Sequence, residues 1–181
     1  MGWYNTIFIV QQICDKNDEY YTPRYAVIPI LKYIKPKSTI WCPFDQEQSQ
    51  YVSCFRENGH TVIASHTDDG EDFFVIREPK CDYIISNPPY SRKNDILERL
   101  FDIGIPFAIL LGATGLFDSQ IRYDMFKNNK FEIMYLYPRV DFFRTKNETR
   151  PSGRSPYQSV YVCQNILPQQ IMFEKIDLKD Y

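Results

Sequence analysis

The sequence predicts one α/β domain built on a mostly parallel sheet, and three observations support this prediction. The chain has 181 residues, which is the length of a single domain. Short apolar runs typical of strands alternate with segments of helical periodicity, as they do in βαβ units. Residues 106–111 are continuously apolar, as a central strand covered by helices on both faces must be.

The individual elements are predicted from apolar periodicity and from residues that end helices. Apolar residues predict a first helix over 26–34, and Asn58-Gly59 ends a second one predicted over 46–58. Apolar residues at helical spacing predict a third helix over 93–103, and a fourth is expected over 119–128. Strands are expected at residues 38–43, 60–65, 73–76, 81–86, 106–111, 132–137, 159–163 and 170–174.

Composition excludes several classes of protein. Aromatic residues make up 16% of the chain, which excludes disorder for its bulk. No apolar run approaches the roughly 18 residues that span a bilayer, and the first residues lack the pattern of a signal peptide. Five scattered cysteines without a CxxC pair predict reduced thiols in the cytoplasm and no metal site. The net charge of −2 means that a nucleic-acid contact must come from a local basic segment.

The predicted strand at 81–86 runs directly into Asn87-Pro88-Pro89-Tyr90. Each proline lacks a backbone donor, so the pair ends the strand in a rigid, extended exit. The amide oxygen of Asn87 and the carbonyl of Pro88 can then face one small amine, beside the flat ring of Tyr90. The alternative is a strand-ending turn with a surface tyrosine, because Asn-Pro pairs are common in turns.

This motif resembles the Asn-Pro-Pro-Tyr motif of S-adenosylmethionine-dependent amino-methyltransferases, above all a small phage-type branch that methylates the N6 amine of adenine in DNA. The resemblance covers residues 20–163. It implies a Rossmann-like methyltransferase fold, with a seven-stranded sheet whose last strand runs antiparallel. It also implies the catalytic residues Asn87, Pro88, Pro89 and Tyr90. Two acceptors that hydrogen-bond to the amine hydrogens would favour a tetrahedral nitrogen, whose lone pair is then available for attack. Catalysis would rest on preorganised electrostatics and on the orientation of the methyl donor.

The segment before the first helix resembles the one that touches the methionine end of the cofactor. It reads Tyr21-Thr22-Pro23 here, and the resemblance makes all three residues cofactor-binding. A threonine cap followed by proline at the first helical position explains the same residues without a cofactor.

The loop after the first strand departs from the family's Asp-Pro-Phe-x-Gly-x-Gly turn. Cys42 stands in place of the aspartate, and Gln46 and Gln48 replace glycines that let the backbone approach the cofactor closely. Asp45 can instead offer a carboxylate to amino or hydroxyl groups of the cofactor. The cofactor-binding residues implied in this loop are Pro43, Phe44 and Asp45.

Two further loops complete the implied cofactor site. Ser65 and His66 follow the second strand, where the family usually places an acid for the ribose hydroxyls, and imidazole can substitute for it. Asp72 and Phe73 resemble the residues that accept from the adenine amine and cover its ring. The alternatives are an ordinary histidine in a polar loop and an acidic, solvated surface loop.

Residues 139–157 form a predicted basic loop between two late strands. Relatives carry an aromatic residue here that stacks on the flipped target base, and Phe142 or Phe143 would serve, although strand alternation places one of them in the core. The loop is otherwise rich in basic residues. We expect Arg144, Arg150 and Arg154 to contact DNA phosphates, the alternative being a solvated loop.

The whole chain, 1–181, is expected to be one domain, with 1–19 as an N-terminal extension and no separate target-recognition domain. The first hypothesis is a DNA adenine-N6 methyltransferase from a phage or mobile element, acting in the cytoplasm of a bacterial host. The second is a methyltransferase acting on RNA adenine or guanine, or on a protein glutamine amide. The third is a non-catalytic member that binds cofactor or nucleic acid. The basic loop favours nucleic acid, and the missing glycines favour the third hypothesis.

Overall fold

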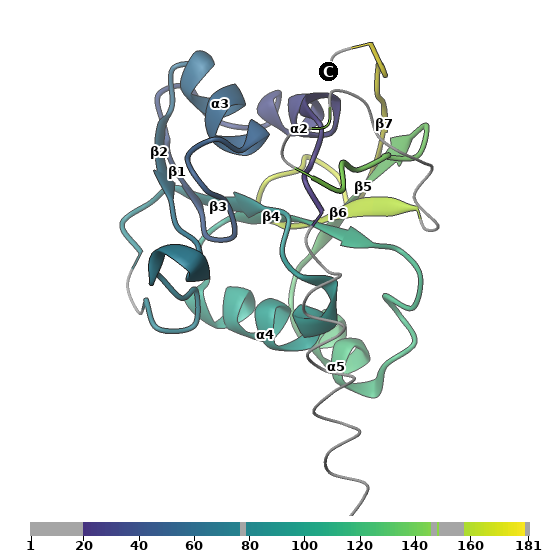
Figure 1. Cartoon of the computed structure of the whole chain (residues 1–181). Helices are drawn as coiled ribbons and strands as arrows, with labels where there is room; N and C mark the ends of the chain where they lie inside the picture. The colour runs from purple at the N-terminus through teal and green to yellow at the C-terminus, as the bar shows by residue number, and fades with distance from the viewer. Residues whose placement is uncertain (1–19, 77–78, 146–147, 149–157, 180–181) are drawn as a thin grey trace, which may run out of the picture.

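One sheet of seven strands organises the computed structural model, which describes residues 20–76, 79–145, 148 and 158–179 (Figure 1). The strands stand side by side in the order β2-β1-β3-β4-β6-β5-β7. Their bounds are β1 Thr39–Cys42, β2 Thr61–Ala64, β3 Tyr83–Ser86, β4 Phe107–Gly112, β5 Glu132–Tyr137, β6 Ser159–Gln164 and β7 Ile171–Lys175. The predicted single α/β domain with a seven-stranded sheet is confirmed.

The sheet is mostly parallel, as predicted, with one correction to the antiparallel strand. Strands β2, β1, β3 and β4 pair in parallel, and β7 pairs in parallel with β5. Strand β6 is inserted between β4 and β5 and runs antiparallel to both. Strand β6 runs antiparallel to β5 and therefore ends near the point where β5 begins. The short connection 165–170 lets β7 start at the same end of the sheet, so β7 runs parallel to β5. Among the described strands, the antiparallel one is therefore β6 and not the last.

Two pairs of helices cover the two faces of the sheet (Figure 1). Helices α2 (Arg24–Leu31) and α3 (Gln50–Glu57) lie on one face, and α4 (Lys93–Ile103) and α5 (Gln120–Asn128) lie on the other. Helix α3 begins four residues later than expected, because the hydroxyl of Ser49 accepts the Val52 N–H at 3.2 Å and caps it there. Residues 46–49, which were expected to be helical, therefore belong to the loop between β1 and α3.

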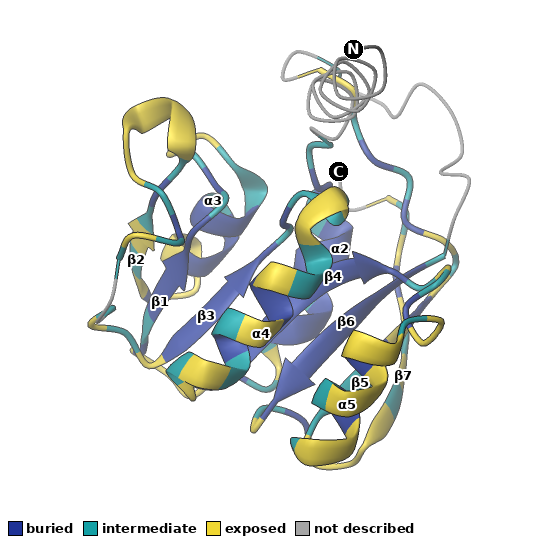
Figure 2. Cartoon of the chain, turned by 90° about the horizontal axis from the view of Figure 1, so that it is seen from below, coloured by how far each residue is buried: buried dark blue, intermediate teal, exposed yellow. Residues whose placement is uncertain are grey.

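The central strands divide the core between the two faces. All residues of β3, β4 and β6 are buried (Figure 2). Ile85 points to the side of α2 and α3, whereas its neighbour Ile84 points to the side of α4, as strand alternation requires. The continuous apolar run of β4 is thus confirmed as a central strand with helices on both faces.

The strand expected at residues 73–76 is wrong. These residues form a turn in which the N–H groups of Val75 and Ile76 bond back to the Asp72 carbonyl. The carbonyls that a strand would have paired instead accept from Arg99 of α4, which bonds Phe73 O at 3.0 Å and also Ile76 O. Strand β2 is consequently the edge of the sheet in the described part of the chain.

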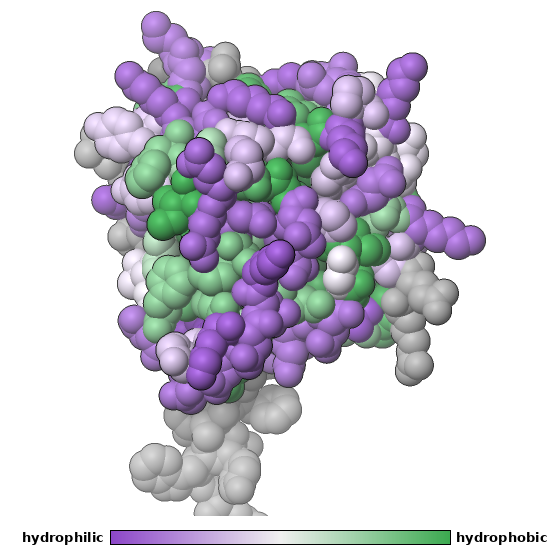
Figure 3. Space-filling view, turned by 180° about the vertical axis from the view of Figure 1, so that it is seen from behind, coloured by the Kyte–Doolittle hydropathy of each residue, from purple (hydrophilic) through white to green (hydrophobic). Residues whose placement is uncertain are grey.

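The face of the molecule shown in Figure 3 mixes hydrophilic side chains with apolar areas. Large exposed apolar side chains include four on β5 and β7, which are Tyr135, Tyr137, Ile171 and Phe173. Across the described residues, the helices are all too short or too polar to span a membrane. That part of the chain also holds no group of three or more His, Cys, Asp or Glu placed to bind a metal ion.

Candidate functional site

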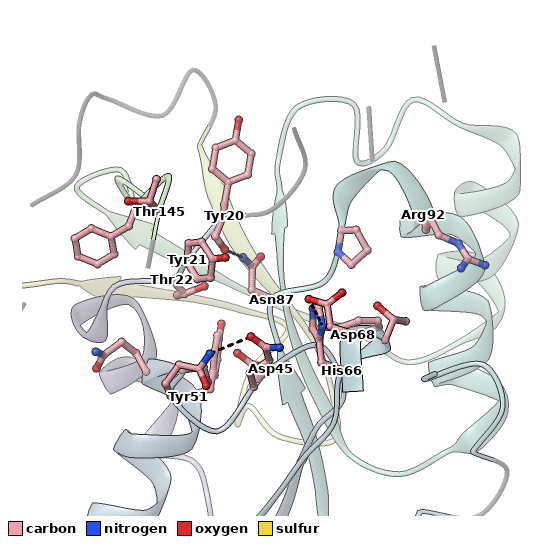
Figure 4. A pocket seen from close by; sticks show the side chains of 18 of the residues that line it. Tyr20, Tyr21, Thr22, Asp45, Tyr51, His66, Asp68, Asn87, Arg92 and Thr145 are labelled. Carbon is pink, nitrogen blue, oxygen red and sulfur yellow. Dashed lines mark hydrogen bonds and ion pairs between the residues drawn. The ribbon is translucent and has the colours of Figure 1, made fainter. Parts of the chain in front are cut away.

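A cavity of about 710 Å³ opens at the carboxyl ends of β1, β2 and β3 (Figure 4). This is where an open α/β sheet is expected to bind ligands, and the volume suits a small-molecule ligand. The structure brings many of the predicted site residues together in its wall. These are Tyr21, Thr22, Phe44, Asp45, His66, Asp72, Asn87, Pro89 and Phe143.

Other predicted site residues lie behind the wall or away from it. Apart from Arg144, which is exposed, and Tyr90, which is half-buried, they are buried. Arg150 and Arg154 lie outside the described residues. The predicted residues that are described but do not line the cavity are Pro23, Pro43, Ser65, Phe73, Pro88, Tyr90, Phe142 and Arg144.

Asn87 stands at the end of β3, between the Tyr20–Thr22 segment and the loop that carries His66 (Figure 4). Its Nδ2 donates to the Tyr20 carbonyl at 3.3 Å. Its Oδ1 is buried and accepts no hydrogen bond from the described residues. A buried amide oxygen without a partner is uncommon in folded proteins.

The two prolines separate Asn87 from the next helix. Pro88 is buried, and Pro89 is extended, with φ −60° and ψ 125°. Tyr90 then opens a short 3₁₀ turn, η2 (Tyr90–Arg92), and packs against the core on the α4 side. Its hydroxyl oxygen is buried. The motif therefore places Asn87 and Pro89 in the cavity wall and the Tyr90 ring behind it.

Asp45 lies where three strand ends meet. Its backbone N–H approaches the carbonyls of Cys42 at 3.3 Å and Ser65 at 3.2 Å, and its carboxylate accepts from Ser86 Oγ at 2.5 Å. Burial raises the pKa of Asp45 to about 6, although hydrogen bonds from Ser86 and Ser49 oppose the shift. Burial also raises the pKa of the Cys42 thiol well above its usual value. This strand end thus carries its acidic group at position 45 and a neutral thiol at position 42.

Another part of the wall carries a histidine and an aromatic ring. His66 Nδ1 accepts the Asp68 N–H at 3.1 Å, so the neutral ring carries its proton on Nε2. The Asp72 carboxylate accepts the Phe74 N–H at 2.9 Å, which places Phe74 in the wall. The Arg92 guanidinium stacks on that ring at 3.9 Å from its centroid.

The wall aromatic in this loop is Phe74, whereas we expected Phe73. Phe73 is 1% exposed and packs against Trp41 and Phe44, with ring centroids 5.6 and 4.9 Å away. Sequence alone offered two adjacent phenylalanines, and the turn at 73–76 decides which of them is buried.

The segment before α2 and the segment that follows β5 meet beside the cavity. Tyr21 and Phe143 exchange backbone hydrogen bonds of 3.0 and 2.9 Å, and the rings of Tyr20 and Phe142 lie 5.8 Å apart. Phe142 is buried, whereas Phe143 lines the cavity. The expected division of these two phenylalanines between core and site therefore agrees with their placement.

Thr22 does not cap the first helix. The cap position of α2 is Pro23, whose side chain makes no capping hydrogen bond. Thr22 is 8% exposed and lines the cavity instead. The capping interpretation is therefore wrong in detail, and the threonine is available to a ligand.

The sequence prediction missed several wall residues. Tyr20 enters next to Tyr21, whose bridge partner is Phe143, and Tyr51 enters from the first turn of α3, which starts at Gln50. Among the missed residues, Arg92 is the one that the sequence could have indicated, because it follows the motif tyrosine by two positions. The other unpredicted wall residues are Arg24, Gln46, Gln48, Ser49, Gln50, Thr67, Asp68, Phe74, Ser91, Thr145 and Glu148.

Comparison with known proteins rests on the fold. No protein-family profile matches the sequence, and no curated protein matches it. A solved modification subunit of a putative type I restriction enzyme from Vibrio vulnificus YJ016 superposes with a TM-score of 0.54 over 95% of this chain. The chain shares the mixed α/β fold of that subunit, with a seven-stranded and mostly parallel sheet. It is 12% identical to that subunit and spans 50% of its length, so the likeness establishes the fold alone.

Proposed function

We propose that this protein transfers a methyl group from S-adenosylmethionine to the exocyclic N6 amine of adenine in DNA. The observation that carries the proposal concerns Asn87 at the end of β3, in the wall of a ligand-sized cavity: its Oδ1 is buried and accepts no hydrogen bond within the described part of the chain. The fold supports it, because the structurally similar Vibrio protein is described as a modification subunit of a restriction enzyme.

The cavity wall fits a cofactor with an amino-acid end and a nucleoside end. Thr22 and Asp45 would receive the amino-acid end, and His66, Asp72 and Phe74 would receive the nucleoside. The wall thus offers a carboxylate for an ammonium and an aromatic face for a base. The bound cofactor would supply an activated methyl group, and the chain would orient it.

The chemical role of the chain is to hold the target amine. Asn87 Oδ1 and the Pro88 carbonyl would accept the two amine hydrogens, which favours a tetrahedral nitrogen with its lone pair free for attack. No strong base is needed before attack, and the proton leaves to solvent afterwards. Phe143, which lines the cavity, would stack on the target base once the base is extruded from the duplex, and the Tyr90 ring would support the wall from behind.

The DNA assignment rests on the basic segment after β5. Arg144 is exposed beside the cavity, and its backbone N–H donates to Glu148 at 2.8 Å, which fixes the start of this loop. We propose that Arg144, Arg150 and Arg154 contact phosphates, while Phe143 lies nearer the base.

A second candidate function is binding without catalysis. Gln46 and Gln48 both line the cavity, and Gln48 Nε2 donates to Gln46 Oε1 at 3.0 Å. Two long side chains therefore stand where the family's turn has glycines. If they narrow the approach to the methyl group, the protein would hold cofactor or nucleic acid without transferring the methyl.

The decisive experiment uses a bacterial strain that lacks its own adenine methylation. The protein and its Asn87→Ala variant are expressed there, and DNA and RNA are digested separately for mass detection of methylated nucleosides. We expect N6-methyladenine in DNA from the wild-type strain alone. Methylation confined to RNA would overturn the DNA assignment. Unmodified DNA and RNA, together with measurable cofactor affinity of the purified protein, would favour the binding function.

A further inference from the structure

The segment that follows β5 has no regular structure of its own. Residues 138–142 lie in no helix or strand, and Phe143 pairs through a single isolated bridge. Such a segment lacks the ladder of hydrogen bonds that fixes a strand, so contacts from other elements must hold it in place. The position of the Phe143 ring in the cavity wall therefore depends on what holds residues 138–143.

Tyr25 supplies one such contact from the first turn of α2. Its hydroxyl donates to the Asp141 carbonyl at 2.9 Å, and the Asp141 N–H donates to the same hydroxyl at 3.1 Å. A phenol hydroxyl can both donate and accept, so one side chain binds both backbone polar groups of Asp141. Tyr25 is 1% exposed, and its ring packs in the core cluster that also contains Val140 and Phe142. The hydroxyl thus fixes the backbone two residues before Phe143.

A second contact comes from the chain just before α2. The N–H of Tyr21 donates to the Phe143 carbonyl at 3.0 Å, and the N–H of Phe143 donates to the Tyr21 carbonyl at 2.9 Å. Tyr21 and Tyr25 belong to one short stretch of chain that leads into α2. Residues 141–143 are therefore held at both ends by this stretch.

The same stretch of chain contacts Asn87. The Tyr20 carbonyl accepts from Asn87 Nδ2 at 3.3 Å (Figure 4). This bond sets which way the amide faces, because the nitrogen is its donor and the oxygen then points away from Tyr20. Asn87 and Phe143 both line the cavity. Residues 20–25 therefore link the side chain that would hold the target amine to the ring that would stack on the target base.

We propose that Tyr25 is a positioning residue, whose hydroxyl holds Asp141 so that a base held at Asn87 can stack on the Phe143 ring. This inference rests on the proposed function. Tyr25 lies outside the cavity wall, so it acts through Phe143 and not by contact with cofactor or DNA. A tyrosine with a purely structural role would change the stability of the protein and leave the kinetics of the folded molecule unaltered.

Tyr25→Phe isolates the hydroxyl, because it keeps the ring in the core. The Asp141 N–H and carbonyl both lose this partner, and the segment that carries Phe143 gains freedom to move. We expect the KM for DNA to rise about fivefold, which is the lower end of what the loss of one stacked base costs. The rate at saturating DNA and the affinity for S-adenosylhomocysteine should each stay within about twofold of wild type.

The assay is methyl transfer at varied concentrations of DNA taken from a strain without adenine methylation, on protein whose fold has been checked by thermal unfolding. Tyr33→Phe is the matched control. It removes a phenol hydroxyl that donates to Glu174 at 2.7 Å, just after the end of α2 and outside the cavity wall. This control should leave the KM for DNA unchanged.

A double-mutant cycle tests whether Tyr25 acts through Phe143. Phe143→Ala alone should raise the KM for DNA at least as much as Tyr25→Phe does. If Tyr25 acts through that ring, adding Tyr25→Phe to Phe143→Ala should raise the KM no further. Hydrogen exchange gives a readout that needs no turnover. The Phe143 amide, which donates to Tyr21, should exchange faster in Tyr25→Phe and at the wild-type rate in Tyr33→Phe.

The outcomes separate this inference from the proposed function. Wild-type protein that methylates no DNA would refute the proposed function and, with it, the role assigned to Tyr25. Active wild-type protein with an unchanged KM in Tyr25→Phe would refute the inference alone, as would an equal rise in Tyr33→Phe. Fully additive effects in the cycle, or an unchanged exchange rate at Phe143, would also refute it, since Tyr25 would then not act through that ring.

Discussion

Replacing Asn87 with alanine separates chemistry from folding. The change removes one hydrogen bond, from Nδ2 to the Tyr20 carbonyl at 3.3 Å, and one buried oxygen that accepts no bond from the described residues. A hydrogen bond of this kind contributes about 0.5–1.5 kcal/mol, and loss of the unpartnered oxygen acts in the opposite direction. We therefore expect the free energy of unfolding to change by less than about 1.5 kcal/mol.

The effect on catalysis should be far larger. If Asn87 Oδ1 accepts from the target amine, its contribution grows as the nitrogen becomes tetrahedral, so the loss falls on the turnover rate. Removing one preorganised group of this type lowers turnover about 100–1000-fold. Cofactor affinity should change little.

The assay is single-turnover methyl transfer to DNA, on protein whose fold and cofactor affinity have been checked. Asn129→Ala is the matched control, because it removes a comparable side-chain bond, from Nδ2 to the Met125 carbonyl at 2.9 Å, beyond the end of α5. A normal rate in Asn87→Ala would refute the amine-holding role. An equal loss in both variants would show that the effect is general.

Three other predictions follow from the same structure. Replacing Arg144, Arg150 and Arg154 together should weaken DNA binding and reduce its salt dependence, with unchanged cofactor affinity; binding that is insensitive to salt would contradict this. Tyr90→Phe should keep methyl transfer nearly normal, whereas Tyr90→Ala should weaken substrate binding; a severe defect in Tyr90→Phe would indicate a role for the hydroxyl. Because the pKa of Asp45 rises from 3.8 unfolded to about 6 folded, its contribution to stability is lost as pH rises from about 4 to about 6. Asp45→Asn should therefore be more stable than wild type by up to about 3 kcal/mol at pH 7.5 and by little at pH 4; denaturant unfolding with no gain at pH 7.5 would contradict this.

Local sequence patterns were enough to predict the central strands, helix α4 and the position of the Asn-Pro-Pro-Tyr motif at a strand end. The six-residue apolar run of β4 could be recognised as a central strand because both of its faces are covered. The end of β3 could be placed within the motif because two prolines cannot continue a ladder. Helix α4 was predicted with its observed bounds, since its apolar spacing is regular and Gly104 ends it at a φ of 70°.

Tertiary packing decided which side chains face the cavity. Whether Phe73 or Phe74 entered the wall depended on Arg99, which lies more than twenty residues away and binds the carbonyls of the turn. Burial in the folded chain raises the pKa of Asp45, whereas the hydrogen bond from Ser86 on another strand lowers it. The bridge between Tyr21 and Phe143 joins segments from opposite ends of the chain.

The physical reason is the range over which each cue acts. Strand exits, helix stops and apolar periods depend on neighbours within a few residues, so a sequence displays them directly. Pairing between distant strands, and the desolvation of a single carboxylate, depend on which surfaces meet when the chain closes. The sequence by itself thus determined that an Asn-Pro-Pro-Tyr exit ends a strand of a parallel sheet. Only the folded arrangement decided that Asn87 and Asp45 share one cavity, because that depends on β1 and β3 lying side by side.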